Sequence, residues 1–389
     1  ISAPPLMRPL SAPLPLTGAV DRYRLKWTGQ LGRRRVGGHK PLLPGIDCEY
    51  ETGKRGYRMK VIDMHCDTIS ELHKDHLQGG SSSILENSLM IDLKKMQAGD
   101  YGLQNFALYV NLEQAKGSPF EFCMELLDTF YQEMEAHEDI IGIVRTYDDI
   151  RRNWEQGRMS ALLTVEEGGT CQGKTAFLRD LYRLGVRMMT LTWNFPNELA
   201  FPNARIEDAD GTFRMAPDTE HGLTDTGIAF VEEMERLGMI IDISHLNDAG
   251  IWDVFRYTRK PFVASHSNAR AMASHPRNLT DDMIRALAER GGVMGINYCT
   301  AFLRDFGPGE EQLSRISDMV EHMKHIRKIG GIGCIGLGSD FDGISGNLEM
   351  GDAGKLPMLA DAMEREGFTA SEIEAVFCKN VLRVYKDIL

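Results

Sequence analysis

Short apolar runs alternate with longer amphipathic segments along most of the chain, from Met59 to its last residue. Runs of apolar and β-branched residues are typical of buried strands, and apolar positions that recur every three or four residues are typical of helices. The expected strands are 60–66, 104–110, 159–166, 188–193, 239–245, 261–266, 292–298 and 334–340. The expected helices are 121–136, 174–184, 225–237, 248–258, 281–290, 313–329 and 371–387.

This alternation predicts an α/β fold made of βα units around a parallel sheet. Eight strand candidates within residues 59–389 favour a (β/α)₈ TIM barrel over an open doubly wound sheet. The last helix carries its own start signal, because Ser371 and Glu374 in "SEIE" fit a capping box. We therefore expect residues 59–389 to form a single catalytic barrel domain.

Residues 1–58 do not share this pattern. They are rich in Pro and Gly, include "GRRRVGG", and show no sustained strand or helix period. They hold 11 Lys and Arg against 4 Asp and Glu, whereas residues 59–389 hold 33 against 52. The segment starts with Ile1 and lacks the basic-then-apolar order of a secretory signal. We expect a disordered or non-native leader, with Met59 as a candidate start of the functional protein.

The composition excludes some classes of protein. Hydrophobic residues make up 42% of the 389 positions, which is enough for a sizeable core. No run approaches the roughly 18–20 apolar residues that a membrane-spanning helix needs, and no hydrophobic tail ends the chain. The formal net charge of −12 argues against a nucleic-acid partner, because binding phosphates requires clustered Lys and Arg.

The cysteines indicate a reducing environment. All seven are widely spaced and none forms a CxxC pair, which favours buried thiols over disulfides or a cysteine-rich zinc cage. We therefore expect a cytoplasmic protein. Cys66 is a poor candidate for a nucleophile, because strand alternation turns it away from His65 and Asp67.

Polar side chains stand at the ends of five of the expected strands. In a parallel barrel these ends form one rim, and the active site lies at that rim. The residues are His65 and Asp67, Glu166 and Glu167, His245, His266, and Asp340 and Asp342. Taken singly, a residue of this kind is more often an ordinary polar residue or a helix cap than a metal ligand. The prediction of a metal site therefore depends on the whole set.

Three histidines and several carboxylates on one rim are the donor set for one or two divalent ions. Zn²⁺ suits these donors, and Mn²⁺ or Fe²⁺ suits them with less preference. His65 and Asp67 project to the same face of a strand, so both can reach one ion. A carboxylate such as Glu166 can bridge two ions about 3.5–4 Å apart, and a water held between them becomes a hydroxide nucleophile.

The other histidines have weaker claims. His322 and His325 are three apart on an expected helix, a spacing that suits a metal but also any solvated face. His221 and His275 lie in loops after expected strands, so they are candidates to support the ligands. Helix surfaces or loops are expected for His73, His76 and His137.

Seven motifs carry a resemblance to a known family. In chain order they are "IDMHCD", "TVEEGG", "TLTWN", "MIIDISH", "ASHSNARA", "HPRNLTDDMIRALAERGG" and "GLGSDFDG". Together they resemble the membrane dipeptidase (renal dipeptidase) family of M19 metallopeptidases over residues 60–389. The resemblance implies a barrel of the metal-dependent amidohydrolase type that holds two zinc ions and cleaves dipeptides, including those with a C-terminal D-residue.

The resemblance also implies roles for individual residues. His65 and Asp67 match the ligands of the first zinc, Glu166 matches the bridging carboxylate, and His245 and His266 match the ligands of the second. Asp340 matches the acid/base that serves the leaving amine. Arg277 in "HPRN" matches the arginine that holds the substrate's C-terminal carboxylate, a task that suits a bidentate guanidinium.

Two departures from the family pattern matter. The family usually shows one Glu before "GG", and here Glu166 and Glu167 both stand there; ungapped spacing to the next motif selects Glu166, but strand parity leaves the choice open. Animal members have a histidine that contacts the scissile carbonyl where this chain has Trp193. Trp193 is then a candidate substrate contact that cannot donate in the same way, so oxyanion stabilisation must come from elsewhere.

The resulting hypothesis is a binuclear zinc dipeptidase whose metal-bridging hydroxide attacks the amide bond. The resemblance adds a homodimer of the bacterial type, without the signal peptide and lipid anchor of animal members. One alternative is another metal-dependent amide hydrolase on the same site, such as a D-aminoacyl or β-lactam hydrolase. The other is a non-catalytic binding protein with the same fold.

Overall fold

The computed structural model describes the chain except for residues 1–50, 53–56, 116, 209–210, 212 and 308. Almost all of the segment 1–58, for which we expected a leader, lies outside the described residues. Its described end consists of two short antiparallel strands, β1 (Glu51–Thr52) and β2 (Tyr57–Arg58).

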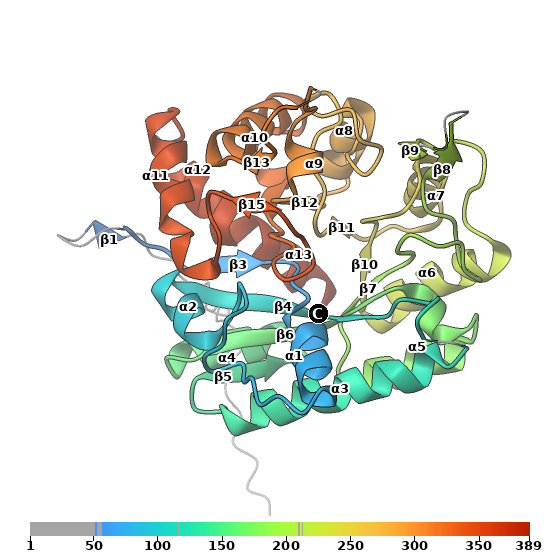
Figure 1. The fold of residues 1–389 in the computed structure, drawn as a ribbon, viewed down its shortest axis with the longest axis horizontal. Helices are drawn as coiled ribbons and strands as arrows, with labels where there is room; N and C mark the ends of the chain where they lie inside the picture. Colours follow the sequence, from blue (N-terminus) through green and yellow to red (C-terminus); the bar gives the residue numbers. More distant parts are fainter. Residues whose placement is uncertain (1–50, 53–56, 116, 209–210, 212, 308) are drawn as a thin grey trace, which may run out of the picture. The chain divides into compact units, whose positions relative to one another are not determined.

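Eight parallel strands close into a barrel, as the alternation predicted. Around the barrel the order is β3, β4, β6, β7, β10, β11, β12 and β14, and β14 pairs with β3 to close the ring. The bounds are β3 Val61–Asp63, β4 Tyr101–Tyr109, β6 Met159–Glu166, β7 Met188–Thr190, β10 Ile240–Asp242, β11 Val263–Ala264, β12 Val293–Ile296 and β14 Ile335–Leu337. The helices lie outside this ring (Figure 1).

One strand of the main sheet was not expected. β5 (Ile141–Val144) pairs in parallel with the first half of β6, whereas the second half of β6 pairs with β7. β5 is therefore an extra strand beside the barrel rather than a member of the ring. Its four residues, "IGIV", form too short an apolar run to be separated from the helix that follows.

Helices occupy the connections between strands. The expected ones are observed as α3 Pro119–Ala136, α5 Thr175–Arg183, α6 Asp225–Leu237, α7 Asp248–Tyr257, α8 Asp281–Glu289 and α10 Ile316–Gly330. Five more were not expected: α1 Thr68–Leu77, α2 Leu93–Ala98, α4 Tyr147–Glu155, α9 Thr300–Leu303 and α11 Pro357–Arg365. Two-stranded pairings are made by β8 Ala204–Glu207 with β9 Phe213–Ala216, and by β13 Leu313–Ser314 with β15 Asn347–Leu348.

The expected capping box at the last helical segment was wrong by two residues. α12 (Ala370–Glu374) begins one residue earlier, and its capping box joins Thr369 to Glu372. The Thr369 side chain accepts from the Glu372 backbone N–H, and the Glu372 carboxylate accepts from the Thr369 N–H at 2.8 Å. The segment is also not one helix, since a π-helical turn (Ala375–Lys379) separates α12 from α13 (Asn380–Ile388).

The C-terminal helix α13 packs against the strands near their N-terminal ends. Its buried residues Val381 and Tyr385 share a core cluster with Ile62, Met188 and Val293 of the barrel. The Tyr385 hydroxyl is held inside by Asn105, which donates to it over 2.7 Å and accepts from it over 3.0 Å. This packing fills one end of the barrel, so the opposite rim is the one available for a site.

Among the described residues, no helix has both the length and the hydrophobicity required to cross a bilayer.

Candidate metal centre

The five expected metal ligands come together at the C-terminal rim of the barrel. The Glu166 carboxylate is at the centre: its Oε1 lies 3.0 Å from His245 Nε2 and 3.6 Å from His266 Nε2. Its Oε2 lies 3.4 Å from His65 Nε2, which is in turn 3.4 Å from Asp67 Oδ2. The two oxygens of one carboxylate thus face different histidines.

The backbone at this rim is irregular, and its conformation directs the candidate ligand side chains toward one another. β3 ends at Asp63, and Asp67 is the residue before α1. His65 and Asp67 therefore lie on the turn that links strand to helix, and the expectation that they share one face of a strand was wrong. His245 and Asp340 have positive φ angles of 68° and 61°. Such conformations are costly for residues other than glycine and concentrate at functional sites.

Glu166 and Glu167 point in different directions. Glu167, with a φ of 106°, is completely buried and accepts from the backbone N–H groups of Gly169 at 2.7 Å and Trp193 at 2.9 Å. The side-chain amide of Asn197 also donates to it. Glu167 therefore fixes the loop after β7, whereas Glu166 alone of the pair faces the histidines.

Several buried polar atoms of the site have no hydrogen-bond partner among the described residues. They are both ring nitrogens of His65, His266 Nε2 and Asp67 Oδ1. An unsatisfied buried polar group is expensive, so native structures rarely keep one without another partner such as an ion. Three overlapping groups of donor atoms, each within 4.8 Å of one another, fit metal ions: His65–Asp67–Glu166, Glu166–His245–His266 and His65–His266–Asp340.

The electrostatics favour a cation in this cluster. Burial raises the pKa of Glu166 to about 8, since three carboxylates stand close together out of water. Burial opposes a charged His65, but Glu166 and Asp67 outweigh it and raise the pKa of that imidazole well above its usual range. Burial lowers the pKa of His245 and of His266 well below 6.5, which keeps both neutral, the form that binds metals.

Asp340 lies at the edge of the cluster. Its Oδ1 is 3.8 Å from His65 Nε2, and its Oδ2 accepts from the Asn297 side chain at 2.9 Å. Burial raises the pKa of Asp340 to about 6. Gly343 makes room here, because a Cβ at that position would stand 2.1 Å from Asp67 Oδ2.

Asp342 is not part of the cluster. It accepts from the Thr68 hydroxyl at 2.6 Å and from the backbone N–H groups of Met90 and Ile91 at 2.6 and 3.3 Å. It therefore ties the segment before α2 to the end of β14, rather than reaching an ion.

Arg277 is buried beside the histidines. Its two terminal nitrogens donate to Ser267 Oγ at 3.2 Å and to the His266 carbonyl at 3.3 Å, and its Nε has no partner among the described residues. The guanidinium stands 5.4 Å from the centre of the Phe302 ring. Arg277 thus contributes a fixed positive charge next to the cluster.

Trp193 is half-buried and lies near His245. Its ring centre is 5.0 Å from that of Tyr109, 5.5 Å from that of Phe195 and 6.1 Å from that of His245. These side chains form an aromatic wall beside the candidate ligands.

Of the remaining histidines in the described part of the chain, His275 is close to this region. Its Nδ1 accepts from the Arg277 backbone N–H at 3.2 Å, whereas the exposed His221 pairs with Asp218. His322 and His325 do not share an ion, because His322 bonds to the backbone of Ala269 and Leu303 and His325 pairs with Asp281. Cys66 is buried, with its thiol 3.5 Å from the Asn105 carbonyl.

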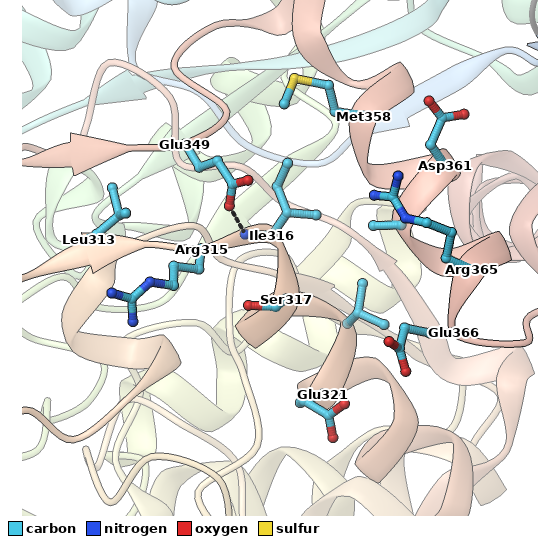
Figure 2. A pocket seen from close by; sticks show the side chains of 12 residues that line it. Leu313, Arg315, Ile316, Ser317, Glu321, Glu349, Met358, Asp361, Arg365 and Glu366 are labelled. Atoms are coloured by element: carbon cyan, nitrogen blue, oxygen red, sulfur yellow. Dashed lines mark hydrogen bonds between the residues drawn. The ribbon is translucent and has the colours of Figure 1, made fainter.

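A separate surface pocket of about 530 Å³ lies where α10 and α11 approach β13 and β15. Figure 2 shows its mixed lining, in which charged and apolar side chains alternate: Arg315, Glu349, Asp361 and Arg365 stand among Leu313, Ile316 and Met358. None of the candidate ligands lines it.

The residues that hydrogen-bond to the candidate ligands were not predicted from the sequence. Asn194 Oδ1 lies 3.1 Å from His245 Nδ1, and Ser265 Oγ lies 2.7 Å from His266 Nδ1. Asn297 holds Asp340, and Asp242 accepts from Ser265. Small polar residues inside "TLTWN", "DISH" and "ASHS" were the available signal, but strand-end Ser and Asn residues are too common to single out.

Comparison with known proteins gives the same family as these motifs. The family model described as membrane dipeptidase (peptidase family M19) matches residues 56–388. An uncharacterised dipeptidase of Schizosaccharomyces pombe is 33% identical over 344 residues, covering 84% of this chain and 80% of the relative.

Solved structures of similar fold include two metallopeptidases. The dipeptidase AC, of family M19, is 25% identical, with a TM-score of 0.76 over 85% of this chain and 99% of that one. A metallopeptidase from Rhodobacter sphaeroides, liganded with a phosphinate mimic of the dipeptide L-Ala-D-Ala, is 24% identical, with a TM-score of 0.75 over the same shares. With a family model that spans the whole barrel and a clustered set of metal donors at its rim, the chain belongs to the membrane dipeptidase family, peptidase family M19.

Proposed function

We propose that this metallo-dipeptidase works with two zinc ions. His65, Asp67 and Glu166 would hold the first, and Glu166, His245 and His266 would hold the second. The observation that carries the proposal is that the two carboxylate oxygens of Glu166 face different histidines. Its Oε1 faces His245 and His266, and its Oε2 faces His65. A carboxylate so arranged is suited to bridging two ions.

When bound, the ions supply a Lewis acid for the scissile carbonyl and lower the pKa of a water toward neutrality. The imidazole and carboxylate donors are those that zinc prefers, although Mn²⁺ or Fe²⁺ is compatible with the same set. The resemblance implies a carbonyl-contacting histidine that has no counterpart at Trp193, so bound ions would have to supply charge stabilisation at the carbonyl oxygen.

Asp340 is the proposed proton carrier. Asn297 occupies its Oδ2, which leaves Oδ1 facing the cluster. Its pKa of about 6, raised by burial, allows the carboxyl group to take up a proton and return it near neutral pH. We propose that Asp340 receives the proton of the attacking water and donates it to the departing amine.

Arg277 is the proposed anchor for the C-terminal carboxylate of the substrate. Its guanidinium is held by Ser267 and by the carbonyl of His266, and its Nε has no partner in the described part of the chain. A free carboxylate is the natural ligand for a buried arginine with unused donor capacity. Trp193, with Tyr109, would form the wall against which the rest of the dipeptide packs.

The proposed substrates are unblocked dipeptides, including L-D dipeptides. The Rhodobacter sphaeroides relative supports this choice, because its ligand mimics L-Ala-D-Ala. A homodimer and a cytoplasmic location remain predictions.

Replacing Asp340 with Asn tests the mechanism. Asn keeps the side-chain shape but cannot carry the proton, so we expect kcat for an unblocked dipeptide to fall at least about 100-fold, the usual size of an acid–base contribution. Zinc content, measured by elemental analysis, should stay at the wild-type value. Loss of zinc together with activity, or full activity, would contradict the assignment.

A further inference from the structure

Asp242 lies at the end of β10 and is completely buried. Its Oδ1 accepts from the backbone N–H groups of Ser244 at 3.0 Å and Ser265 at 2.8 Å. Its Oδ2 accepts from the hydroxyls of Thr190 at 2.8 Å and Ser265 at 2.5 Å. One carboxylate thus joins the ends of β7, β10 and β11, and two of these strands lead into candidate metal ligands.

This arrangement fixes where the protons of the His266 ring are. The single hydroxyl proton of Ser265 is used in the short bond to Asp242, because a carboxylate that accepts four bonds has no proton to give. Ser265 Oγ must therefore accept from His266 Nδ1, which lies 2.7 Å away. The Nδ1 atom then carries the hydrogen, and Nε2 is left as a free lone pair 3.6 Å from Glu166 Oε1.

We propose that Asp242 and Ser265 are positioning residues that set the His266 tautomer required for metal binding. The role in metal binding rests on the proposed function, whereas the tautomer itself does not. A partner that accepts from the second ring nitrogen is known to orient metal-binding histidines and to tune their affinity. Here the acceptor is a hydroxyl whose own proton is committed to a buried carboxylate.

The three histidines of the site differ in this respect. His245 reaches the same tautomer by a direct route, because the amide oxygen of Asn194, 3.1 Å from its Nδ1, can only accept. His65 has no partner on either ring nitrogen among the described residues. The hydroxyl-and-carboxylate relay is therefore specific to His266 in this cluster.

An Asp242→Asn substitution should reverse the relay. Two backbone N–H groups face Oδ1, so the oxygen of the new amide must stay there and its NH₂ group must face Ser265. Ser265 Oγ then accepts from the amide and turns its own proton to His266 Nδ1. The lone pair moves to Nδ1, and the Nε2 atom that faces Glu166 becomes protonated.

Ser244 is the other acceptor that the Ser265 proton could reach. Its Oγ lies 3.3 Å from Ser265 Oγ, farther than the 2.7 Å to His266 Nδ1. The double variant D242N/S244A removes this acceptor, and the tautomer change should then be at least as complete as in D242N.

The test uses the metal-free protein labelled with ¹⁵N histidine, because ring-nitrogen shifts distinguish the two tautomers. An H266Q spectrum assigns the signals. We expect the Nδ1–H form of His266 in the wild type and the Nε2–H form in D242N. Asp63→Asn is the matched control, because Asp63 is also buried at a strand end and accepts backbone N–H groups, but no relay joins it to His266. It should leave the His266 tautomer unchanged.

Zinc affinity, measured by competition with a chelator, provides the second readout. S265A leaves the ring free to take either tautomer and should weaken the second zinc about 10- to 100-fold. D242N should weaken it more, and D242N/S265A should recover to the S265A value, because the wrongly directed donor is gone. Ser265→Thr keeps the hydroxyl and should bind zinc better than S265A.

The outcomes separate this proposal from the proposed function. An unchanged His266 tautomer in D242N would overturn the relay. Weaker zinc binding by D242N/S265A than by D242N would overturn it as well. If the tautomer changes as expected but the wild type binds no second zinc, the relay stands and the two-zinc proposal fails.

Discussion

Glu166 and Glu167 are adjacent in sequence but do different work. Glu166 faces three histidines, and Glu167 holds the backbone of the Trp193 loop. Substituting each with Gln should therefore give different results. We expect E166Q to lose the capacity to bind two zinc ions, since an amide cannot bridge them, and we expect E167Q to keep that capacity.

In E167Q the damage should be structural. One oxygen that accepts from the Trp193 N–H becomes an amide NH₂ group, so two donors would face each other in a buried place. This should lower the free energy of unfolding by about 1–3 kcal/mol in urea titrations. Equal zinc losses in E166Q and E167Q would contradict the assignment of metal binding to Glu166 and of a structural role to Glu167.

Arg277 gives a prediction about substrates. If its guanidinium binds the C-terminal carboxylate, dipeptides amidated at the C-terminus should be hydrolysed far less efficiently than free dipeptides. Arg277→Lys should raise KM for free dipeptides at least about 10-fold, since Lys cannot reproduce the bidentate contact. Equal kcat/KM values for free and amidated dipeptides would instead favour an amide hydrolase that does not bind the C-terminal carboxylate of its substrate.

At the scale of single residues, the sequence indicated which strand-end side chains would lie together, but not the residues that surround them. The positions of His65, Asp67, His245 and His266 could be proposed because each follows an apolar run. Strand alternation could not decide between Glu166 and Glu167, because the choice depends on a positive φ at Glu167 that no period encodes. The partners Asn194, Asp242, Ser265 and Asn297 were not predicted, because their contacts cross between strands.

At the scale of elements, the loop after β11 is attached to α10 through His322. The Nδ1 atom of this buried imidazole accepts from the Ala269 N–H at 3.1 Å, and its Nε2 donates to the Leu303 carbonyl at 2.9 Å. The bond from Ala269 requires the neutral ring, because a protonated Nδ1 has no lone pair with which to accept. Burial lowers the pKa of His322 to about 4, so the unfolded chain binds more protons than the folded chain between about pH 4 and 6.5.

The folded state should therefore lose stability as the pH falls through this window. The contribution of His322 is complete above about pH 6.5, and we expect about 2 kcal/mol of it to be lost at pH 5. His322→Asn keeps an acceptor for Ala269 but cannot titrate. The stability difference between wild type and H322N should thus shrink by that amount from pH 7 to pH 5 in urea titrations; a constant difference would contradict the assignment.

The elements themselves were largely predictable. Seven of the eight barrel strands lie within expected runs, and β4 begins three residues before its run at 104–110. A parallel sheet buried on both faces leaves continuous apolar stretches, which is why these runs could be found. The sequence did not predict β5 or five of the helices. The elements β5, α2 and α9 are too short to establish a period, whereas α1, α4 and α11 are as long as helices that were predicted. The capping box was misread because Thr369, rather than Ser371, precedes the first helical residue.

At the scale of the whole molecule, the barrel has two different ends. α13 and Tyr385 fill the end opposite the candidate metal ligands, and the rim carries buried carboxylates that favour a cation. The βα pattern was sufficient to predict this polarity, because active sites of such barrels lie at the C-terminal ends of the strands. Residues 1–58, with their basic excess, remain an open part of the sequence-based prediction.

The most direct test of the central claim is a zinc titration of the chelator-treated protein, followed by hydrolysis of an unblocked L-D dipeptide. The account predicts no activity without metal and full activity only at two zinc ions per chain, because the donors around Glu166 form two overlapping sets. Full activity at one zinc per chain, or activity that does not depend on metal, would contradict it.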